Sequence, residues 1–319
     1  MKSRQNTGIT GETRLYAVIG NPVRHSLSPA LQSRAFAEND IDAVMLAFEA
    51  DTENLPEVVN SMKTLGAKGW NVTMPCKNRM AQLCDRLSRE AELTGSVNTV
   101  ENRDGVLTGH STDGIGFIRH IRASGLSPEG KVIIAGAGGA AASIAAALTD
   151  TAREVVIANR TFGKAQTLAE KLNAGLAQSD GQSADHPDSE ITQPADRPDQ
   201  SAGHPALVRA VPLGDAEVMK RELADADLFV NAGSAGMAPH EDRTPLEDLS
   251  LLPGKCAVAD IVYNPRQTRL LREAAEAGRR TCGGLGMLVQ QGAEAFEIWT
   301  GQKFPIHNVA EAVLNEPLY

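Results

Sequence analysis

Short apolar runs alternate with segments of helical spacing along most of this 319-residue chain. In the first third, strands are predicted over residues 14–20, 43–48 and 69–73, with helices from Ser28-Pro29, over 55–65 and over about 78–86. Ser28 is expected to cap the first of these helices, and Pro29 to be its first residue. The β-α-β-α-β order predicts a mainly parallel sheet with helices on both faces.

A second series of strands and helices follows from residue 114. Its strands are predicted over 131–135, 154–158, 227–231 and 257–261. Its helices are predicted over 115–124 and 161–172, with an alanine-rich helix between them that follows a glycine-rich turn and ends at Leu148. Two last helices, over 287–300 and 309–314, are expected to return to the first domain. At about 150 residues per domain, the length also suggests two domains. We therefore expect an α/β protein with one domain of residues 1–113 and 286–319, a second of residues 114–285, and a cleft between them.

Residues 175–206 interrupt this pattern. They are rich in Asp, Ser, Gln, Pro and Ala and almost free of large apolar side chains. Such a segment cannot bury enough surface to offset the entropy lost on ordering, so we expect a disordered surface insertion. His186 and His204 lie in it, and no metal role is expected for them because nothing rigid holds them.

Composition excludes several classes of function. The 31 basic and 40 acidic residues give a net charge of −9, which is not the footprint of a nucleic-acid-binding or anionic-membrane-binding protein. No apolar run reaches the roughly 18 residues of a membrane span, and the basic start lacks the apolar stretch of a secretory signal. The four cysteines show no CxxC spacing, so we expect reduced thiols in a cytoplasmic protein without a metal site.

A glycine-rich turn follows the strand predicted at 131–135. Gly136, Gly138 and Ala141 match G-x-G-x-x-A between a strand and a helix, the context in which this motif binds a dinucleotide. Gly136 would allow the tight turn, Gly138 the approach of a pyrophosphate, and the helix start would offer free N–H groups. The alternative is a plain strand-to-helix turn that uses glycine only for its geometry.

The end of the next strand indicates which dinucleotide binds. An NAD-binding domain usually places an acidic residue there, but this chain has Asn159, Arg160 and Thr161, with Lys164 one turn later. Arg160 can pair with a 2′-phosphate, and Lys164 adds a second positive charge. These residues predict a Rossmann-type domain that binds NADP, the alternative being an ordinary solvated basic helix start.

Polar residues also cluster where predicted strands end, which is where ligands bind in open α/β sheets. Each of them alone could serve only to cap a helix, order a turn or face solvent. Together they suit a small polyhydroxylated acid, which makes the first domain the candidate substrate domain. The clusters are Ser26 with Ser28; Asn71, Thr73 and Lys77; Ser96, Asn98 and Thr99; and Thr112 with Asp113.

These clusters carry a close resemblance to a known family. The chain resembles the shikimate dehydrogenases, including quinate/shikimate dehydrogenases, over roughly residues 14–315 apart from the insertion. Ser111, Gly233 and Gly283 depart from the family's usual residues, which leaves the coenzyme preference and the fit of the substrate's edge open. The matching motifs are GNPVRHSLSP (20–29), NVTMPCK (71–77), VNT (97–99), STDGIG (111–116), GAGGA (136–140), NRT (159–161), VYNP (262–265) and GLGML (284–288).

The resemblance implies an NADP-dependent oxidoreductase that acts on a CH–OH group. It would reversibly reduce 3-dehydroshikimate to shikimate with NADPH, a step toward chorismate and the aromatic amino acids. Lys77 would be the general acid/base, because hydride addition to a ketone leaves an alkoxide that needs a proton, and Asp113 would be its partner. The protein would be a monomer or a homodimer.

The other site residues implied by the resemblance fall into two groups. Substrate-binding residues would be Ser26, Ser28, Asn71, Thr73, Asn98, Tyr263 and Gln291. Cofactor-binding residues would be Gly136, Ala137, Gly138, Gly139, Ala140, Asn159, Arg160, Thr161 and Lys164, with Ile261 and Gly284 beside the nicotinamide.

Three alternatives stay open. A quinate/shikimate dehydrogenase of dual specificity differs by one substrate hydroxyl, which a few pocket contacts decide. A non-catalytic sensor on the same fold would bind the ligand without turnover, although it would be expected to lose Lys77 or Asp113. A generic NADP-dependent reductase of an unrelated substrate is the third.

Overall fold

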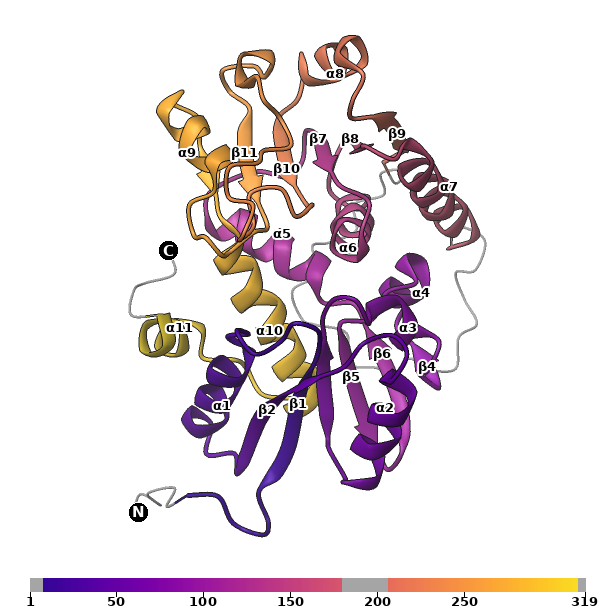
Figure 1. Cartoon of the computed structure of the whole chain (residues 1–319), viewed down its shortest axis with the longest axis vertical. Helices are drawn as coiled ribbons and strands as arrows, with labels where there is room; N and C mark the ends of the chain where they lie inside the picture. Colours follow the sequence, from indigo (N-terminus) through magenta and orange to yellow (C-terminus); the bar gives the residue numbers. More distant parts are fainter. Residues whose placement is uncertain (1–7, 180–205, 315–319) are drawn as a thin grey trace. The chain divides into compact units, whose positions relative to one another are not determined.

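The computed structural model describes residues 8–179 and 206–314, which form two compact α/β units (Figure 1). The described part of unit 1 is residues 8–124 and 285–314, and that of unit 2 is residues 125–179 and 206–284. Residues 114–124 therefore belong to unit 1 and not, as predicted, to the second domain. The reason is helix packing within unit 1: a Cβ on Gly116 would lie 2.7 Å from the backbone N of Gln291.

Unit 1 contains a six-stranded sheet in the order β2-β1-β3-β5-β6-β4. The pairs β1–β2, β1–β3 and β4–β6 are parallel, as predicted, whereas β5 is antiparallel to both β3 and β6. Because β5 runs the opposite way, its first residues lie at the carboxyl end of β3. The strands are β1 (Arg14–Gly20), β2 (Ala43–Glu49), β3 (Gly69–Val72), β4 (Arg86–Leu87), β5 (Thr99–Arg103) and β6 (Val106–His110).

The helices of unit 1 enclose two apolar clusters, one of which joins β1 and β2 to the first and last helices. Ser28 is not a cap: Leu27 occupies that position and Ser28 is already helical. The helix predicted over 78–86 is shorter and begins one residue earlier, at Lys77. These helices are α1 (Ser28–Glu38), α2 (Leu55–Thr64), α3 (Lys77–Ala81), α4 (Arg89–Thr94), α5 (Asp113–Ala123), α10 (Gly284–Thr300) and α11 (Ile306–Leu314).

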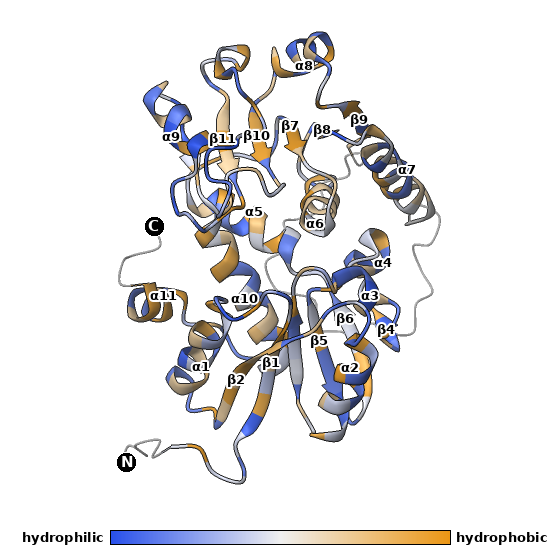
Figure 2. Ribbon diagram, viewed as in Figure 1, coloured by the Kyte–Doolittle hydropathy of each residue, from blue (hydrophilic) through white to orange (hydrophobic). Residues whose placement is uncertain are grey.

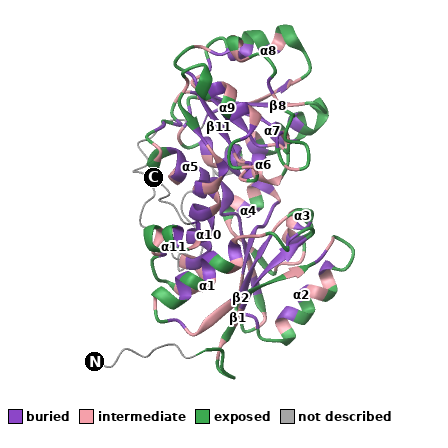
Figure 3. Ribbon diagram, turned by 60° about the vertical axis from the view of Figure 1, so that its left-hand side comes forward, coloured by how far each residue is buried: buried purple, intermediate pink, exposed green. Residues whose placement is uncertain are grey.

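Unit 2 contains a six-stranded sheet in the order β12-β11-β10-β7-β8-β9, and every pair in it is parallel. This is the strand order of dinucleotide-binding domains. Figure 2 shows β7 and β10 as mostly apolar, and Figure 3 shows the strands of unit 2 as buried, as expected for a sheet covered on both faces. The strands are β7 (Lys131–Ala135), β8 (Glu154–Asn159), β9 (Val208–Pro212), β10 (Leu228–Asn231), β11 (Ala257–Asp260) and β12 (Thr281–Cys282).

The helices of unit 2 show that the predicted start of the insertion, at residue 175, is wrong. Helix α7 continues to Ser179, so the first residues expected to be disordered are helical. Leu176 is buried one turn beyond Leu172, and Asn173 bonds the backbone of Val208 on β9 in both directions, at 2.8 and 3.1 Å. Residues 180–205, with His186 and His204, lie outside the described residues. The helices are α6 (Gly139–Leu148), α7 (Phe162–Ser179), α8 (Ala216–Leu223), the 3-10 turn η1 (Leu249–Leu251) and α9 (Arg269–Glu276).

Candidate active site

Lys77 and Asp113 form an ion pair at the carboxyl edge of the unit 1 sheet. Lys77 is the first residue of α3, shortly after β3, and Asp113 is the first residue of α5, shortly after β6. Lys77 Nζ lies 2.5 Å from Asp113 Oδ2, and the two side chains are 16% and 8% exposed. The sequence thus correctly predicted that these two residues are partners, and the ammonium retains some access to solvent.

Asn98 fixes the orientation of the Asp113 carboxylate. Its Nδ2 donates to Asp113 Oδ1 at 2.9 Å, while its Oδ1 accepts from the backbone N of Thr112 at 2.8 Å. The same Nδ2 also lies 3.3 Å from Gln291 Oε1 on α10. Each carboxylate oxygen of Asp113 therefore has its own donor, and four predicted site residues are joined in one network.

Asn71 presents an acceptor that no protein group uses. Its Nδ2 donates to Thr99 Oγ1 at 3.1 Å and to the backbone O of Asn98 at 3.3 Å. The residue is only 5% exposed, so its Oδ1 is buried, and this oxygen has no hydrogen-bond partner among the described residues. An unpaired buried acceptor costs about 1–3 kcal/mol, so this oxygen is suited to a donor from a ligand, such as a hydroxyl.

The remaining substrate-site candidates of unit 1 lie on segments that flank this network. Ser26 Oγ accepts from the backbone N of Ser28 at 3.2 Å, which orders the turn before α1. Thr73 follows β3 and is partly exposed. Within the described residues, no hydrogen bond joins Ser26, Ser28 or Thr73 to the Lys77–Asp113 pair.

Two network members went unrecognised as site residues in the sequence. Thr99 and Thr112 were placed in the polar clusters, but neither was among the predicted substrate-binding residues. Their hydroxyls lie 3.3 Å apart, and Thr112 Oγ1 also donates to the backbone O of Gln291 at 3.1 Å. The sequence carried one usable signal, the two adjacent polar pairs Asn98-Thr99 and Thr112-Asp113. Predicting the segments between them as an antiparallel pair of strands would have placed these two pairs side by side.

In unit 2, the turn between β7 and α6 has the geometry that the motif predicts. Gly136 has a φ of +135°, and a Cβ there would lie 2.9 Å from the carbonyl of Ala232. Gly138 faces open space, since no atom lies within 4 Å of where its Cβ would stand. The N-terminus of α6 follows at Gly139, with Ala140 in its first turn, and Ala141 is fully buried.

The end of β8 carries the basic residues that were expected to select NADP. Asn159 Nδ2 donates to the backbone O of Thr161 at 3.0 Å and shapes this turn. Arg160 and Lys164 are exposed, and neither forms an ion pair with a carboxylate in the part of the chain that the structure describes. Both cations are available to an anion.

The structure also brings Ile261 and Gly284 together. A Cβ on Gly284 would lie 2.2 Å from the carbonyl O of Ile261, so only glycine permits this approach. Tyr263 follows two residues after Ile261, and burial raises the pKa of its hydroxyl. These three residues share one end of the unit 2 sheet with the Gly136 turn, because they follow parallel strands.

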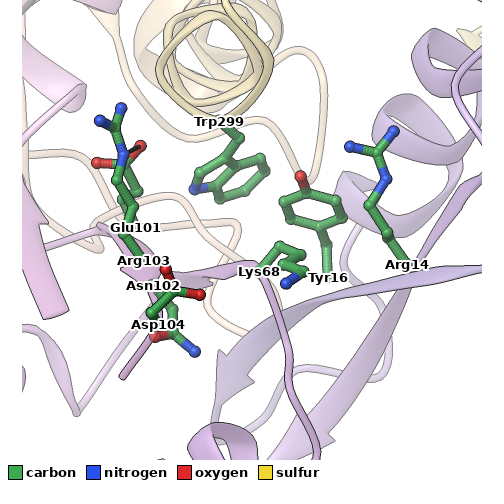
Figure 4. Close-up of a pocket in the computed structure, with 8 residues that line it drawn as sticks. All are labelled: Arg14, Tyr16, Lys68, Glu101, Asn102, Arg103, Asp104 and Trp299. Atoms are coloured by element: carbon green, nitrogen blue, oxygen red, sulfur yellow. Dashed lines mark hydrogen bonds and ion pairs between the residues drawn. The ribbon is translucent and has the colours of Figure 1, made fainter. Parts of the chain in front are cut away.

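Unit 1 has a pocket of about 310 Å³ at the opposite, amino-terminal edge of its sheet (Figure 4). The rings of Tyr16 and Trp299 pack in it at a centroid distance of 5.0 Å, and Trp299 Nε1 donates to the backbone O of Val100. None of the predicted site residues lines this pocket. We attribute the Tyr16–Trp299 contact to the packing of α10 on the sheet.

Three further observations concern the expected chemistry of the protein. All four cysteines are free thiols, as predicted. Among residues 8–179 and 206–314, no group of three or more His, Cys, Asp or Glu side chains could hold a metal ion. Over the same residues, every helix is too short or too polar to cross a membrane.

Comparisons with known proteins place these features in one family. Three family models match: the shikimate dehydrogenase substrate binding domain over residues 18–100, shikimate / quinate 5-dehydrogenase over 122–181, and the shikimate 5′-dehydrogenase C-terminal domain over 284–314. The chain is 39% identical to the shikimate dehydrogenase (NADP(+)) of Alkaliphilus metalliredigens, over 97% of this chain and 99% of that protein. It is 42% identical to the enzyme of the same name from Methanopyrus kandleri, over 97% and 98%.

A solved structure agrees with the sequence relatives. Shikimate 5-dehydrogenase from Listeria monocytogenes, in complex with shikimate and NAD, superposes with a TM-score of 0.82 at 37% identity, covering 98% of this chain and 99% of that one. Fold, motif order and near-complete coverage agree, and the chain belongs to the shikimate dehydrogenase family.

Proposed function

We propose that this protein catalyses the reversible reduction of 3-dehydroshikimate to shikimate with NADPH. The observation that carries the proposal is the Lys77–Asp113 ion pair, braced by Asn98 and accompanied by the unpaired Oδ1 of Asn71. A proton donor beside an acceptor for a hydroxyl is what the reduction of a hydroxylated ketone needs. The names of the most similar relatives support the same substrate and coenzyme.

Lys77 supplies the proton in the proposed reaction. When bound, NADPH supplies the hydride that adds to the ketone carbon and leaves the carbonyl oxygen as an alkoxide. The ammonium of Lys77 stabilises the developing negative charge and donates a proton to that oxygen. In the reverse direction, neutral Lys77 accepts the hydroxyl proton of shikimate. Asp113 holds the ammonium in place and accepts a hydrogen bond from the reacting hydroxyl.

The other polar residues of unit 1 bind and orient the substrate. Asn71 Oδ1 accepts a hydrogen bond from a ring hydroxyl, and Gln291 and Thr73 contribute further polar contacts. Ser26 and Ser28 share with these residues the binding of the substrate's hydroxyls and carboxylate, and the bond from Ser28 N to Ser26 Oγ orders the turn before α1. The resemblance adds Tyr263 to the proposed substrate-binding residues.

Unit 2 fits NADP at three places. Gly138 leaves space for a pyrophosphate, and the N-terminus of α6 offers free N–H groups to it. Arg160 and Lys164 provide two unpaired cations for the 2′-phosphate, with Asn159 and Thr161 shaping their turn. Ile261 and Gly284 form the surface against the nicotinamide.

We infer a cytoplasmic location from the four free thiols, since oxidising compartments favour disulfides. We also infer an assembly state of monomer or homodimer. Light scattering of the purified protein at several concentrations distinguishes these two states, and a trimer or larger assembly would contradict the inference.

Absorbance of the reduced nicotinamide tests the proposed function. Shikimate and quinate are each incubated with NADP and with NAD, and initial rates are measured for all four pairs. We expect shikimate with NADP to give the highest kcat/KM. Quinate with NAD as the best pair would make the protein a quinate dehydrogenase, and shikimate binding without turnover in any pair would make it a sensor.

A further inference from the structure

Asp260 is a buried carboxylate that the proposed reaction does not use. It is the last residue of β11 and is 2% exposed. Its Oδ1 accepts from Asn231 Nδ2 at 2.9 Å and from the backbone N of Val262 at 3.0 Å, and its Oδ2 accepts from Thr268 Oγ1 at 2.7 Å. All three donors are uncharged, so hydrogen bonds alone hold this carboxylate.

The three donors come from three different segments of unit 2. Asn231 ends β10, Val262 lies in the loop after β11, and Thr268 caps α9 by accepting from the backbone N of Leu271 at 3.4 Å. Residues 261–267 form the loop between β11 and α9. One carboxylate therefore fixes both the beginning and the end of this loop.

Asn231 joins a second loop to the same carboxylate. Its Nδ2 also donates to the backbone O of Ala235 at 2.9 Å, and its Oδ1 accepts from the backbone N of Gly233 at 3.2 Å. The two loops meet again where the backbone N of Ala238 donates to the backbone O of Asn264 at 3.3 Å. Asp260 thus lies at the base of both loops that follow β10 and β11.

Stability alone does not account for a carboxylate at this position. Burial without a cationic partner is unfavourable, and it raises the pKa of Asp260 to about 6. A buried apolar side chain would avoid this cost. What the carboxylate provides is three directional hydrogen bonds from three segments, which no apolar side chain can replace.

The loop that Asp260 holds carries Ile261 and Tyr263. We propose that Asp260 is a positioning residue that sets this loop so that Ile261 meets the nicotinamide and Tyr263 meets the substrate. The inference rests on the proposed function, which assigns those two contacts. A displacement of about 1 Å at such contacts lowers a rate by as much as 10²-fold.

Two variants and one conservative replacement test this role. Asp260→Ala removes all three acceptor contacts. Thr268→Val removes the contact at the end of the loop, together with the α9 cap on Leu271, and remains informative if Asp260→Ala fails to fold. Thr268→Ser keeps the hydroxyl. We expect kcat/KM for shikimate to fall on the order of 10- to 100-fold in the first two variants, with a rise in KM, and to stay within about twofold in Thr268→Ser.

The matched control is Glu222→Ala, a second buried carboxylate of unit 2 that lies beside the amino-terminal edge of the same sheet. Glu222 bonds Arg209 at 2.8 Å and Lys131 at 3.0 Å, so its loss lowers Tm without touching the loops. Kinetics are measured well below the lowest Tm. Kinetic losses in Asp260→Ala and Thr268→Val but not in Glu222→Ala support the positioning role.

Two results would overturn it. If Thr268→Val and Asp260→Ala keep kcat and KM within about twofold of an active wild type, only the positioning role fails. The same holds if Glu222→Ala shows an equal kinetic loss. If the wild type itself turns over neither shikimate nor quinate, the proposed function fails first and the positioning role with it.

Discussion

At the scale of single residues, Lys77 is the proposed proton donor. Its Nζ is held by Asp113, whose other oxygen is held by Asn98, so the ammonium is preorganised before a substrate arrives. We expect Lys77→Ala to reduce turnover by at least 10²-fold, the usual scale of general acid–base catalysis, while NADP still binds to unit 2.

The measurement is the shikimate-dependent rate together with a fluorescence titration of NADPH. Lys68→Ala is the matched control, because Lys68 is an exposed lysine that lines the pocket at the other edge of the same sheet. Near-normal turnover of Lys77→Ala would remove Lys77 from the mechanism.

Asn71 makes a second prediction at this scale. Its unpaired Oδ1 is the acceptor proposed for a substrate hydroxyl, and a hydrogen bond to such a group is worth about 0.5–1.5 kcal/mol or more. Asn71→Ala should raise the KM for shikimate by roughly 10-fold and leave the KM for NADP unchanged. An unchanged shikimate KM in steady-state assays would show that this oxygen does not contact the substrate.

At the scale of elements, the amino-terminal edge of the unit 2 sheet is held by an ion-pair network. Arg209 on β9 bonds both Glu222 and Glu154, and the buried Lys131 at the start of β7 bonds Glu222. The Arg209 guanidinium, together with Lys131, lowers the pKa of Glu222 to about 2 from its ordinary 4.5. The network therefore joins β7, β8 and β9 to the end of α8.

The sign of this pKa shift predicts a pH dependence. A carboxyl whose pKa is depressed in the folded state contributes stability that is present above its unfolded pKa and is lost as pH falls through the folded value. We expect Glu222→Gln to cost about 3 kcal/mol at pH 7 and progressively less between pH 4.5 and 2. Urea denaturation of wild type and variant across this range checks it, and a constant difference would contradict the assignment.

At the scale of the whole molecule, a net charge of −9 opposes the binding of a polyanionic coenzyme. Local cations must therefore supply the attraction, and Arg160 is exposed and unpaired within the described residues. Arg160→Ala should raise the KM for NADP by about 10-fold or more, leave the KM for NAD unchanged, and weaken the salt dependence of NADP binding.

Lys220→Ala provides the comparison, since Lys220 is an exposed lysine on α8 in the same unit. An equal rise in the KM for NADP in both variants would indicate a general charge effect. A rise in the KM for both NADP and NAD in Arg160→Ala would indicate that Arg160 contacts the part of the molecule that the two coenzymes share.

The sequence by itself determined the α/β class of fold and supplied the candidate residues for the chemistry. The strand at Lys131–Ala135 was predicted with its correct bounds, and the alanine-rich helix after the glycine turn was predicted with its correct end at Leu148. This succeeds because local periodicity reports which positions are buried, and because glycine at Gly136 reports a backbone conformation that other residues rarely adopt. The pairing of Lys77 with Asp113 followed from the family resemblance.

Tertiary structure decided what depends on the path of the chain. The placement of β5 beside β3, the assignment of α5 to unit 1 and the extension of α7 each result from contacts with segments that are remote in sequence. Asn98 reaches Gln291 across 193 positions, and Asp260 reaches Thr268 only because β11 ends beside the start of α9. Hydrophobic periodicity carries no information on such pairs. It shows which face of a helix or strand is buried, but not which other segment packs against that face.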